Sequence, residues 1–311
     1  GGEPLLNPDL INIIKFLKNE NLSVSLFTNG LLLDEERTEK LALAGVNLVF
    51  LHIQKDQQRQ DLHPNHTIAD INALRTQKAK MLYKAGIEAG MSVTVRKSDL
   101  EENFDNDINY FKQTIYMTDF VITLFRNTAE YGRYSSFSNE ELQKGHYKQK
   151  CSDEPEMQEI LEFFQDRNLE LYTYLTGRYD KNSPRWICYH FAASYKNNEL
   201  KFIQNIRNSK FERFYLKRLK EKTGAYPFYT KQNCIINSIY MFLNSLSGGY
   251  FSGNQKFLIK SWNKYKRIKR ILVQEPAGIN SAGILDYCES CPDITVKNGK
   301  IVPLCICDNF E

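Results

Sequence analysis

Apolar residues in the first 130 positions of this 311-residue chain follow two alternating patterns. In residues 7–18, NPDLINIIKFLK, they recur on one helical face, and Asn7-Pro8 is a favourable helix start. The apolar run LSVSLF that follows predicts a strand ending at Thr28-Asn29-Gly30. The alternation continues with predicted helices over 34–44, 68–85 and 106–116 and predicted strands over 47–54, 91–97 and 119–126.

This alternation predicts an α/β fold. Short apolar strands of this kind are typical of parallel sheets, and right-handed crossovers place the helices outside the sheet. After Arg126 the pattern changes to a polar stretch, and further on a basic helix is expected over 202–222. We therefore expect three consecutive parts: a core over 1–135, a mainly helical region over 136–275, and a small cysteine-rich module over 276–311.

Composition narrows the class of protein. Hydrophobic residues make up 42% and charged residues 25% of the chain, which is ordinary for a soluble globular protein. No window approaches the roughly 18–20 uninterrupted apolar residues that a transmembrane helix needs. A net charge of +4 does not indicate a polyanion-binding protein. The cysteine count is odd, at seven, which favours metal ligation over disulfides and predicts a reducing, cytoplasmic location.

Four of those cysteines crowd into the last 24 residues, as a CxxC pair and a CxC pair. The segment Lys297-Asn298-Gly299-Lys300 between the pairs is a strong turn signal, and a hairpin there would bring them together. Four thiolates can hold either zinc or a [4Fe–4S] cluster, and the residues leave this choice open. The predicted metal ligands are Cys288, Cys291, Cys305 and Cys307.

The chain opens on the turn Gly1-Gly2-Glu3-Pro4. Two adjacent glycines allow a backbone carbonyl to approach a ligand closely, Glu3 offers a negative charge to a cation, and Pro4 stiffens the turn before the helix. On its own, such a turn is more often a simple connection between a strand and a helix. At the carboxyl end of a parallel strand, it would lie where α/β proteins place their active sites.

The turn is followed by LLNPDLINIIKFLKNENLSVSLFTNG, and together they resemble the radical S-adenosylmethionine (SAM) enzymes over roughly residues 1–130. The resemblance implies a partial, TIM-like (β/α)6 barrel. It also implies that Gly1, Gly2, Glu3 and Pro4 bind the amino group of the methionine moiety, with Thr28 and Asn29 beside them. The turn alone does not distinguish a simple strand-to-helix connection from an active-site turn, but this longer pattern favours the enzyme.

Members of that family hold a catalytic [4Fe–4S] cluster with three cysteines spaced CxxxCxxC, upstream of the Gly-Gly-Glu-Pro turn. The 311 residues contain no such triplet. We therefore expect that the first barrel strand and its cluster loop are missing, and that the chain as given is inactive.

The resemblance also implies further cofactor contacts at the ends of later strands. Arg96 is the candidate for the carboxylate of SAM, because its planar fork suits a bidentate pair. Gln54 and Thr94 are the candidates for the ribose hydroxyls. His52 is evenly balanced between a ligand and a satisfied interior histidine, whereas the HxxH spacing of His63 and His66 is expected to be a solvated loop.

The implied activity is reductive cleavage of SAM to methionine and a 5′-deoxyadenosyl radical, which abstracts hydrogen from a substrate. That substrate could be a peptide, a lipid or a small molecule, and the electron donor a flavodoxin or ferredoxin. The tail would carry an auxiliary [4Fe–4S] cluster or zinc. The alternative is a non-catalytic zinc-tail protein that binds RNA or anionic lipid through the basic segments 207–222 and 256–270.

Overall fold

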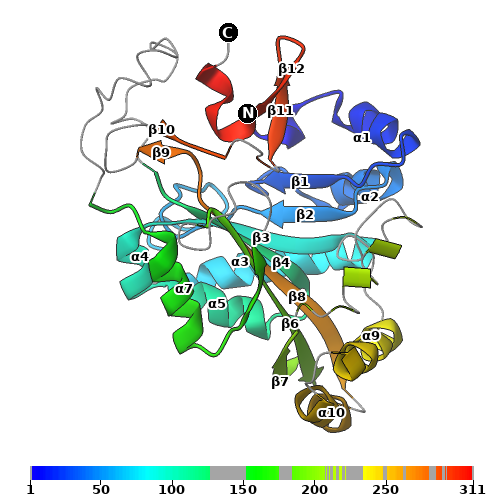
Figure 1. Ribbon diagram of the computed structural model, residues 1–311. Helices are drawn as coiled ribbons and strands as arrows, with labels where there is room; N and C mark the ends of the chain where they lie inside the picture. The colour runs from blue at the N-terminus through cyan, green and yellow to red at the C-terminus, as the bar shows by residue number, and fades with distance from the viewer. Residues whose placement is uncertain are drawn as a thin grey trace. The chain divides into compact units, whose positions relative to one another are not determined.

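The computed structural model of the chain describes residues 2–126, 152–174, 184–206, 234–247, 251–261, 264–279, 285–288 and 293–309, with isolated positions between them. Its main sheet has the hydrogen-bonded strand order β1-β2-β3-β4-β8-β6-β5, and β7 pairs with β6 (Figure 1). The strands are β1 (Ser25–Thr28), β2 (Leu48–Leu51), β3 (Glu88–Val95), β4 (Met117–Leu124), β5 (Leu171–Tyr174), β6 (Trp186–Lys196), β7 (Glu199–Asn205) and β8 (Tyr265–Gln274).

The first three strands carry the parallel pattern that the sequence predicted. β1 pairs with β2 in parallel from Ser25↔Leu48 to Thr28↔Leu51, and β2 pairs with β3 in parallel. All four residues of β2 are buried, as expected for a strand covered on both faces. The α/β prediction is therefore confirmed for this part of the chain.

Local capping explains where the helices begin and end. The N-cap Thr67 and Asp70 form a reciprocal capping box at the start of α3, and Gly45 and Gly86 close α2 and α3 with φ angles of 98° and 83°. The helical elements are η1 (Pro4–Leu6), α1 (Leu10–Asn19), α2 (Glu35–Ala44), α3 (Ile68–Ala85), α4 (Lys97–Glu102), α5 (Phe104–Gln113), α7 (Met157–Asp166), α9 (Cys234–Ser247), α10 (Phe251–Lys260) and η4 (Leu304–Asn309).

In region 136–275, β5 and β6 match the apolar runs LELYTYLT and RWICYHFAAS, but β7 and β8 were not expected in this mainly helical region. The helix expected over 202–222 is wrong at its start, since Phe202–Asn205 belongs to β7. Asn197 and Asn198 adopt φ angles of 53° and 63°, which suits a two-residue hairpin turn. That turn folds β7 back antiparallel onto β6 and overrides the helical pattern.

Two compact units make up the chain, and both are discontinuous in sequence. The first comprises 1–93, 106–121 and 189–271, and the second comprises 94–105, 122–188 and 272–311. This division differs from the three consecutive parts expected from the sequence. Strands β3, β4, β6 and β8 each contribute residues to both units, so their two ends belong to different units.

The basic run of residues 264–270 is a buried strand and not the exposed helical face that its composition suggested. Arg267 and Lys269 on β8 have no solvent exposure. Lys269 Nζ donates to the carbonyl oxygens of Phe111 and Thr114, at 2.5 Å for the second. Because burial disfavours the charged amine, the pKa of Lys269 lies well below its usual range, and the nearby Arg267 lowers it further.

Arg267 has partners of its own in the first unit. Its Nε donates to the carbonyl oxygen of Ile115 at 3.0 Å, and its Nη1 lies 3.1 Å from Glu88 Oε2. Glu88, which the sequence suggested was on the surface, is therefore buried in an ion pair. Arg270 pairs in the same way with Asp119 at 2.5 Å. These cations satisfy internal carbonyl and carboxylate groups, so this strand does not provide the basic surface that RNA or lipid binding requires.

Replacing the buried lysine should destabilise the protein strongly. We expect Lys269→Ala to lower the free energy of unfolding by about 2–4 kcal/mol, because it leaves a cavity and removes a hydrogen-bond donor from two buried carbonyls. Lys201→Ala on the exposed strand β7 is the matched control and should leave the unfolding free energy unchanged. Denaturant unfolding followed by circular dichroism measures both, and equal stability of the two variants would contradict the interior role of Lys269.

Candidate functional site

The carboxylate of Glu3 joins the opening turn to the end of β1. Its Oε1 accepts hydrogen bonds from Leu5 N at 3.0 Å and from Thr28 Oγ1 at 2.6 Å, and its Oε2 accepts one from Asn29 N at 2.8 Å. These bonds hold the half-buried negative charge at the carboxyl end of a parallel strand. The structure thus brings together three of the residues that the sequence singled out, Glu3, Thr28 and Asn29.

This arrangement leaves room and acceptor capacity for a cationic ligand group. A carboxylate offers about four lone-pair sites, and three are used, so Oε2 can still accept a hydrogen bond. A Cβ atom placed on Gly2 would have no other atom within 4 Å, so the space beside the turn is open. An ammonium group such as the methionine amine of SAM fits these acceptors. Gly1 lies outside the described residues, and Pro4 begins η1.

The Thr28-Asn29-Gly30 segment is a turn whose side chains are already engaged. Thr28 Oγ1 donates to Glu3 and accepts from Gly30 N at 3.0 Å, while Asn29 Oδ1 accepts from Leu31 N at 2.9 Å. Gly30 has a φ angle of 73°, in the left-handed region that favours glycine. The segment therefore directs the Asn29 N–H toward Glu3, and its residues hold the Glu3 carboxylate in position.

His52 follows β2 and behaves as an interior residue. Its backbone N donates to Thr28 O at 2.8 Å, and its Nδ1 lies 3.2 Å from Ser92 O. Burial lowers the pKa of His52, against the smaller opposing effect of the Ser92 carbonyl, and so favours the neutral ring. Of the two interpretations that the sequence left open, these contacts favour the satisfied interior histidine.

The sequence did not single out Arg75, which fixes the backbone at the end of β2. Its Nε and Nη2 donate to Ile53 O at 3.0 and 2.6 Å, and its Nη1 pairs with Asp107 on α5 at 2.5 Å. Arg75 is 1% exposed and lies among the buried residues of α3. A cation on the apolar face of a predicted helix was the signal that could have identified it.

Gln54 comes directly after this anchored carbonyl, and its backbone N donates to Gln57 Oε1 at 3.2 Å. Gln54 belongs to the first compact unit, whereas Thr94 and Arg96 belong to the second. Arg96 is exposed. Its guanidinium carbon lies 5.0 Å from the centroid of the Phe125 ring, and its backbone N donates to Asp99 at the start of α4.

The HxxH pair contributes to the loop that precedes α3. The His66 ring lies 2.9 Å from His63 O through Nδ1 and 3.0 Å from Lys55 O through Nε2. Within the part of the chain that the structure describes, no three metal-binding side chains gather at one point. These contacts agree with the expected loop role of His63 and His66.

The tail forms the predicted hairpin. β11 (Ile294–Lys297) and β12 (Lys300–Pro303) pair antiparallel, and Asn298 and Gly299 have φ angles of 50° and 74°. Leu304 N donates to Asp293 O at 2.9 Å, which holds the two ends of the hairpin together. A short antiparallel pair, β9 (Gly278–Ile279) with β10 (Leu285–Asp286), precedes it.

The tail cysteines on the two sides of the hairpin differ in burial. Cys288 is buried, Cys291 is half-buried and Cys305 is exposed. Partial burial raises the pKa of Cys291 to about 11, and the neighbouring thiols of Cys305 and Cys288 add to this effect. The described positions nevertheless hold no ready-made set of three or more ligands, so a metal would have to draw the side chains together.

Comparison with known proteins finds relatives for the first third of the chain. Residues 1–104 match the Radical SAM superfamily. An AdoMet-dependent heme synthase from Methanosarcina barkeri is 36% identical over 111 residues, which is 33% of this chain and 29% of that protein. A PqqA peptide cyclase from Gluconobacter oxydans is 28% identical over 100 residues, covering 32% and 28% of the two chains.

A third relative, a probable GTP 3′,8-cyclase from Methanococcus maripaludis, is 52% identical over 50 residues, or 16% of each chain. The matched segment thus spans less than a third of the length of each of these relatives. Among the described helices, none has the length and apolar character needed to cross a bilayer. The match over residues 1–104 includes the Glu3-anchored turn and the parallel strands behind it, so this first third of the chain is similar to the radical SAM superfamily.

Proposed function

We propose that the protein binds SAM at the Gly-Gly-Glu-Pro turn and takes part in its reductive cleavage. In this superfamily a bound [4Fe–4S] cluster reduces SAM to methionine and a 5′-deoxyadenosyl radical that abstracts hydrogen from a substrate. The observation that carries the proposal is the Glu3 carboxylate, fixed by Thr28 and Asn29 and still able to accept a hydrogen bond.

Each candidate residue has a distinct task in this proposal. Glu3 and the Gly2 carbonyl accept from the amino group of the methionine moiety, and Thr28 and Asn29 hold Glu3 in place. Arg96, exposed and resting on Phe125, pairs with the carboxylate, since its planar fork matches two oxygens. Gln54 and Thr94 serve the ribose hydroxyls. The protein thereby orients the cofactor, while the cofactor supplies the difficult chemistry.

The catalytic cluster is not held by these residues. Its CxxxCxxC triplet is absent from the 311 positions, so we assign no electron-transfer step to them. A partial barrel is the fold that this proposal implies, with a flavodoxin or ferredoxin as electron donor in the cytoplasm. The names of the matched relatives refer to a heme, a peptide and a nucleotide, so they do not select among a peptide, a lipid and a small molecule as the substrate of this chain.

The cysteine tail is proposed as a second metal site. Cys288, Cys291, Cys305 and Cys307 would supply four thiolates to zinc or to an auxiliary [4Fe–4S] cluster, which relays electrons or holds the tail together. The hairpin between the two cysteine pairs supports this proposal, because it brings the segments on its two sides together. The non-catalytic alternative is less well supported, because the basic residues Arg267 and Lys269 that it would use are buried.

Neutralising Glu3 should weaken cofactor binding. We expect Glu3→Gln to raise the dissociation constant for SAM about tenfold or more, because the amide loses charge-assisted hydrogen bonds to the ammonium group and to the turn. Isothermal titration of the 311-residue chain with SAM measures this change. Glu20→Gln, on an exposed residue at the end of α1, is the matched control and should bind as the unchanged chain does.

Two results would contradict this assignment. One is the absence of SAM binding by the unchanged chain, and the other is equal affinity of Glu3→Gln and Glu20→Gln. With dithionite present, the 311-residue chain should release no 5′-deoxyadenosine, because it lacks the CxxxCxxC triplet. Release of that product would show that other cysteines can serve the cleavage.

The tail cysteines should determine the metal content of the protein. We expect anaerobically purified protein to contain either one zinc ion or iron with matching sulfide per chain, and Cys291→Ser to lose it. Cys188→Ala, which alters a buried cysteine on β6, should retain the metal. Elemental analysis and visible absorbance distinguish zinc from iron–sulfur. Equal metal content in the two variants would refute the tail site.

A further inference from the structure

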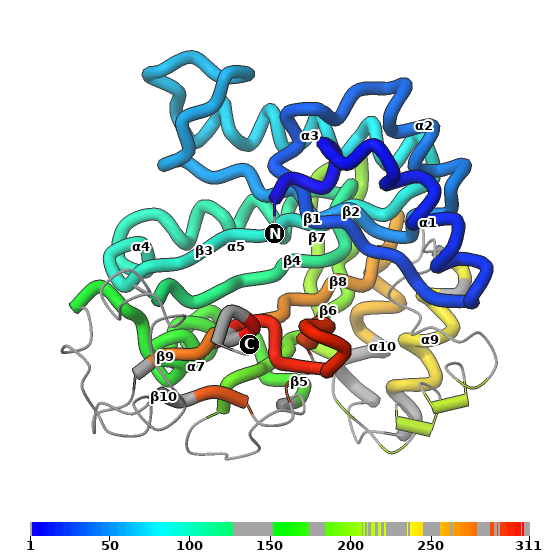
Figure 2. Tube along the Cα trace, turned by 90° about the horizontal axis from the view of Figure 1, so that it is seen from above, coloured from blue at the N-terminus to red at the C-terminus, as the bar shows by residue number. Residues whose placement is uncertain are grey.

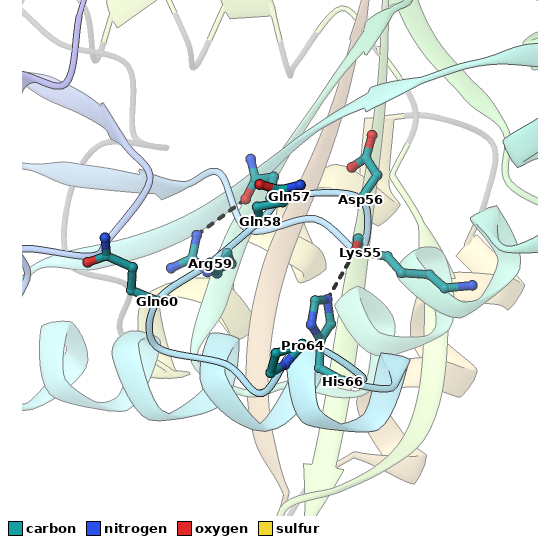
Figure 3. Close-up of a pocket in the computed structure, with 8 residues that line it drawn as sticks. All are labelled: Lys55, Asp56, Gln57, Gln58, Arg59, Gln60, Pro64 and His66. Atoms are coloured by element: carbon teal, nitrogen blue, oxygen red, sulfur yellow. Dashed lines mark hydrogen bonds between the residues drawn. The ribbon is translucent and has the colours of Figure 1, made fainter.

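The loop between β2 and α3 encloses a pocket that the cofactor-binding residues do not account for. Its volume is about 590 Å3, and Gln57, Gln58, Arg59, Pro64 and His66 are among its lining residues. Figure 3 shows Gln57, Gln58 and Arg59 on one arm of the loop and Pro64 and His66 on the other. In the trace of Figure 2 the loop stands out beside α3.

Arg59 is the buried charged group of this pocket, with only 9% of its surface exposed. Its Nε and Nη2 pair with the two carboxylate oxygens of Asp61 at 2.9 and 2.8 Å, and its Nη1 donates to Gln57 Oε1 at 3.2 Å. Gln57 Oε1 also accepts from the backbone N of Gln54. Arg59 is therefore fixed both by its ion pair and by the end of β2.

These contacts leave part of the guanidinium unused. The group carries five N–H donors, and the three bonds leave one N–H on Nη1 and one on Nη2 with no partner among the described residues. The two lie on neighbouring nitrogens of one planar group, so they can act as a fork. Leaving such donors buried and unpaired is costly, which favours an acceptor with two oxygens in the pocket.

We propose that this pocket binds a carboxylate group of the substrate on the unused donors of Arg59. This inference deepens the proposed function by assigning a chemical class to its substrate. The carboxylate could belong to an acidic side chain of a peptide or to a free organic acid. Asp61 already neutralises Arg59, so a doubly charged phosphate would meet more repulsion than a singly charged carboxylate.

Other charged lining residues do not compete for this role. Lys55 and Asp56 both line the pocket, and Figure 3 shows both side chains pointing away from Arg59. His66 has its two ring nitrogens at carbonyl oxygens of the loop. The Arg59 fork is thus the group that a ligand oxygen would meet. Its link through Gln57 to Gln54 sets the bound group beside the end of β2, where ligands of parallel α/β sheets bind.

The test titrates the 311-residue chain with propionate and with the peptide Ac-Ala-Glu-Ala-NH2, following the Arg59 Nε–H signal by NMR. Propionamide and Ac-Ala-Gln-Ala-NH2 are the uncharged counterparts. We expect both carboxylates to bind and both amides to bind at least about tenfold more weakly. Tighter binding of the peptide would point to a peptide substrate, and equal binding to a free acid.

Two substitutions should shift the carboxylate affinity in opposite directions. Arg59→Lys keeps the charge but loses the fork, so it should weaken binding about tenfold, measured by calorimetry. Asp61→Asn removes the competing carboxylate and should tighten binding several-fold. A merely structural ion pair would make both variants weaker. Arg167→Lys is the matched control, because Arg167 forms the same bidentate pair with Asp105 elsewhere in the chain.

Several outcomes would overturn the proposal: equal binding of carboxylates and amides, unchanged affinity in Arg59→Lys, weaker binding in Asp61→Asn, or binding of inorganic phosphate in place of either carboxylate. The assay needs neither SAM nor an iron–sulfur cluster. Its failure is therefore distinguishable from a failure of the SAM-binding proposal, which the Glu3→Gln titration measures separately.

Discussion

The structure at the amino-terminal end depends on how one negative charge is compensated. Glu3 is half-buried, and a carboxylate taken from water is stable only where donors replace its hydration. A hydroxyl from Thr28 and backbone N–H groups from Leu5 and Asn29 provide that replacement. The same bonds fix the turn against β1, so one interaction sets both the local fold and the position of the acceptor that a cationic ligand would meet.

In β8 the buried groups are basic side chains, and hydrogen-bond acceptors compensate them where donors compensate Glu3. Lys269 and Arg267 meet carbonyl oxygens of residues 111, 114 and 115, which lie at and just beyond the end of α5. Carbonyls at the carboxyl end of a helix have no partner within the helix and carry partial negative charge. The cations of β8 therefore complete the end of α5, and a run of lysines and arginines can be part of an interior.

Local chemistry made some of the fold predictable from the sequence. The Asn298-Gly299 turn and the glycine caps of α2 and α3 follow from residues within a few positions of each other, as do the apolar runs that form β1 and β2. The β8 strand could not be predicted in this way. The partners of Lys269 lie more than 150 residues away, and a strongly basic segment is more often solvated.

In the candidate site, too, features set by local sequence could be predicted and features set by distant contacts could not. The Gly-Gly-Glu-Pro turn and the Thr28-Asn29-Gly30 segment could be identified from their sequence pattern. Three other features could not be predicted, because each depends on where a side chain points. They are the Glu3–Thr28 hydrogen bond, the hydrogen bonds from Arg75 to the Ile53 carbonyl and the unused donors of Arg59. Arg96 illustrates the limit, since the sequence predicted it within a strand over 91–97, whereas it is the exposed N-cap residue of α4.

Because the first unit is discontinuous in sequence, the segment that matches the family does not form a compact unit by itself. The family match covers residues 1–104, but the compact unit that contains most of them also requires 106–121 and 189–271. A fragment cut after the matched segment would leave Glu88 without Arg267 and would remove β4 and the strands that follow it in the sheet. The matched segment is thus not a separate folding unit, and the turn that Glu3 anchors belongs to a compact unit that includes residues far downstream.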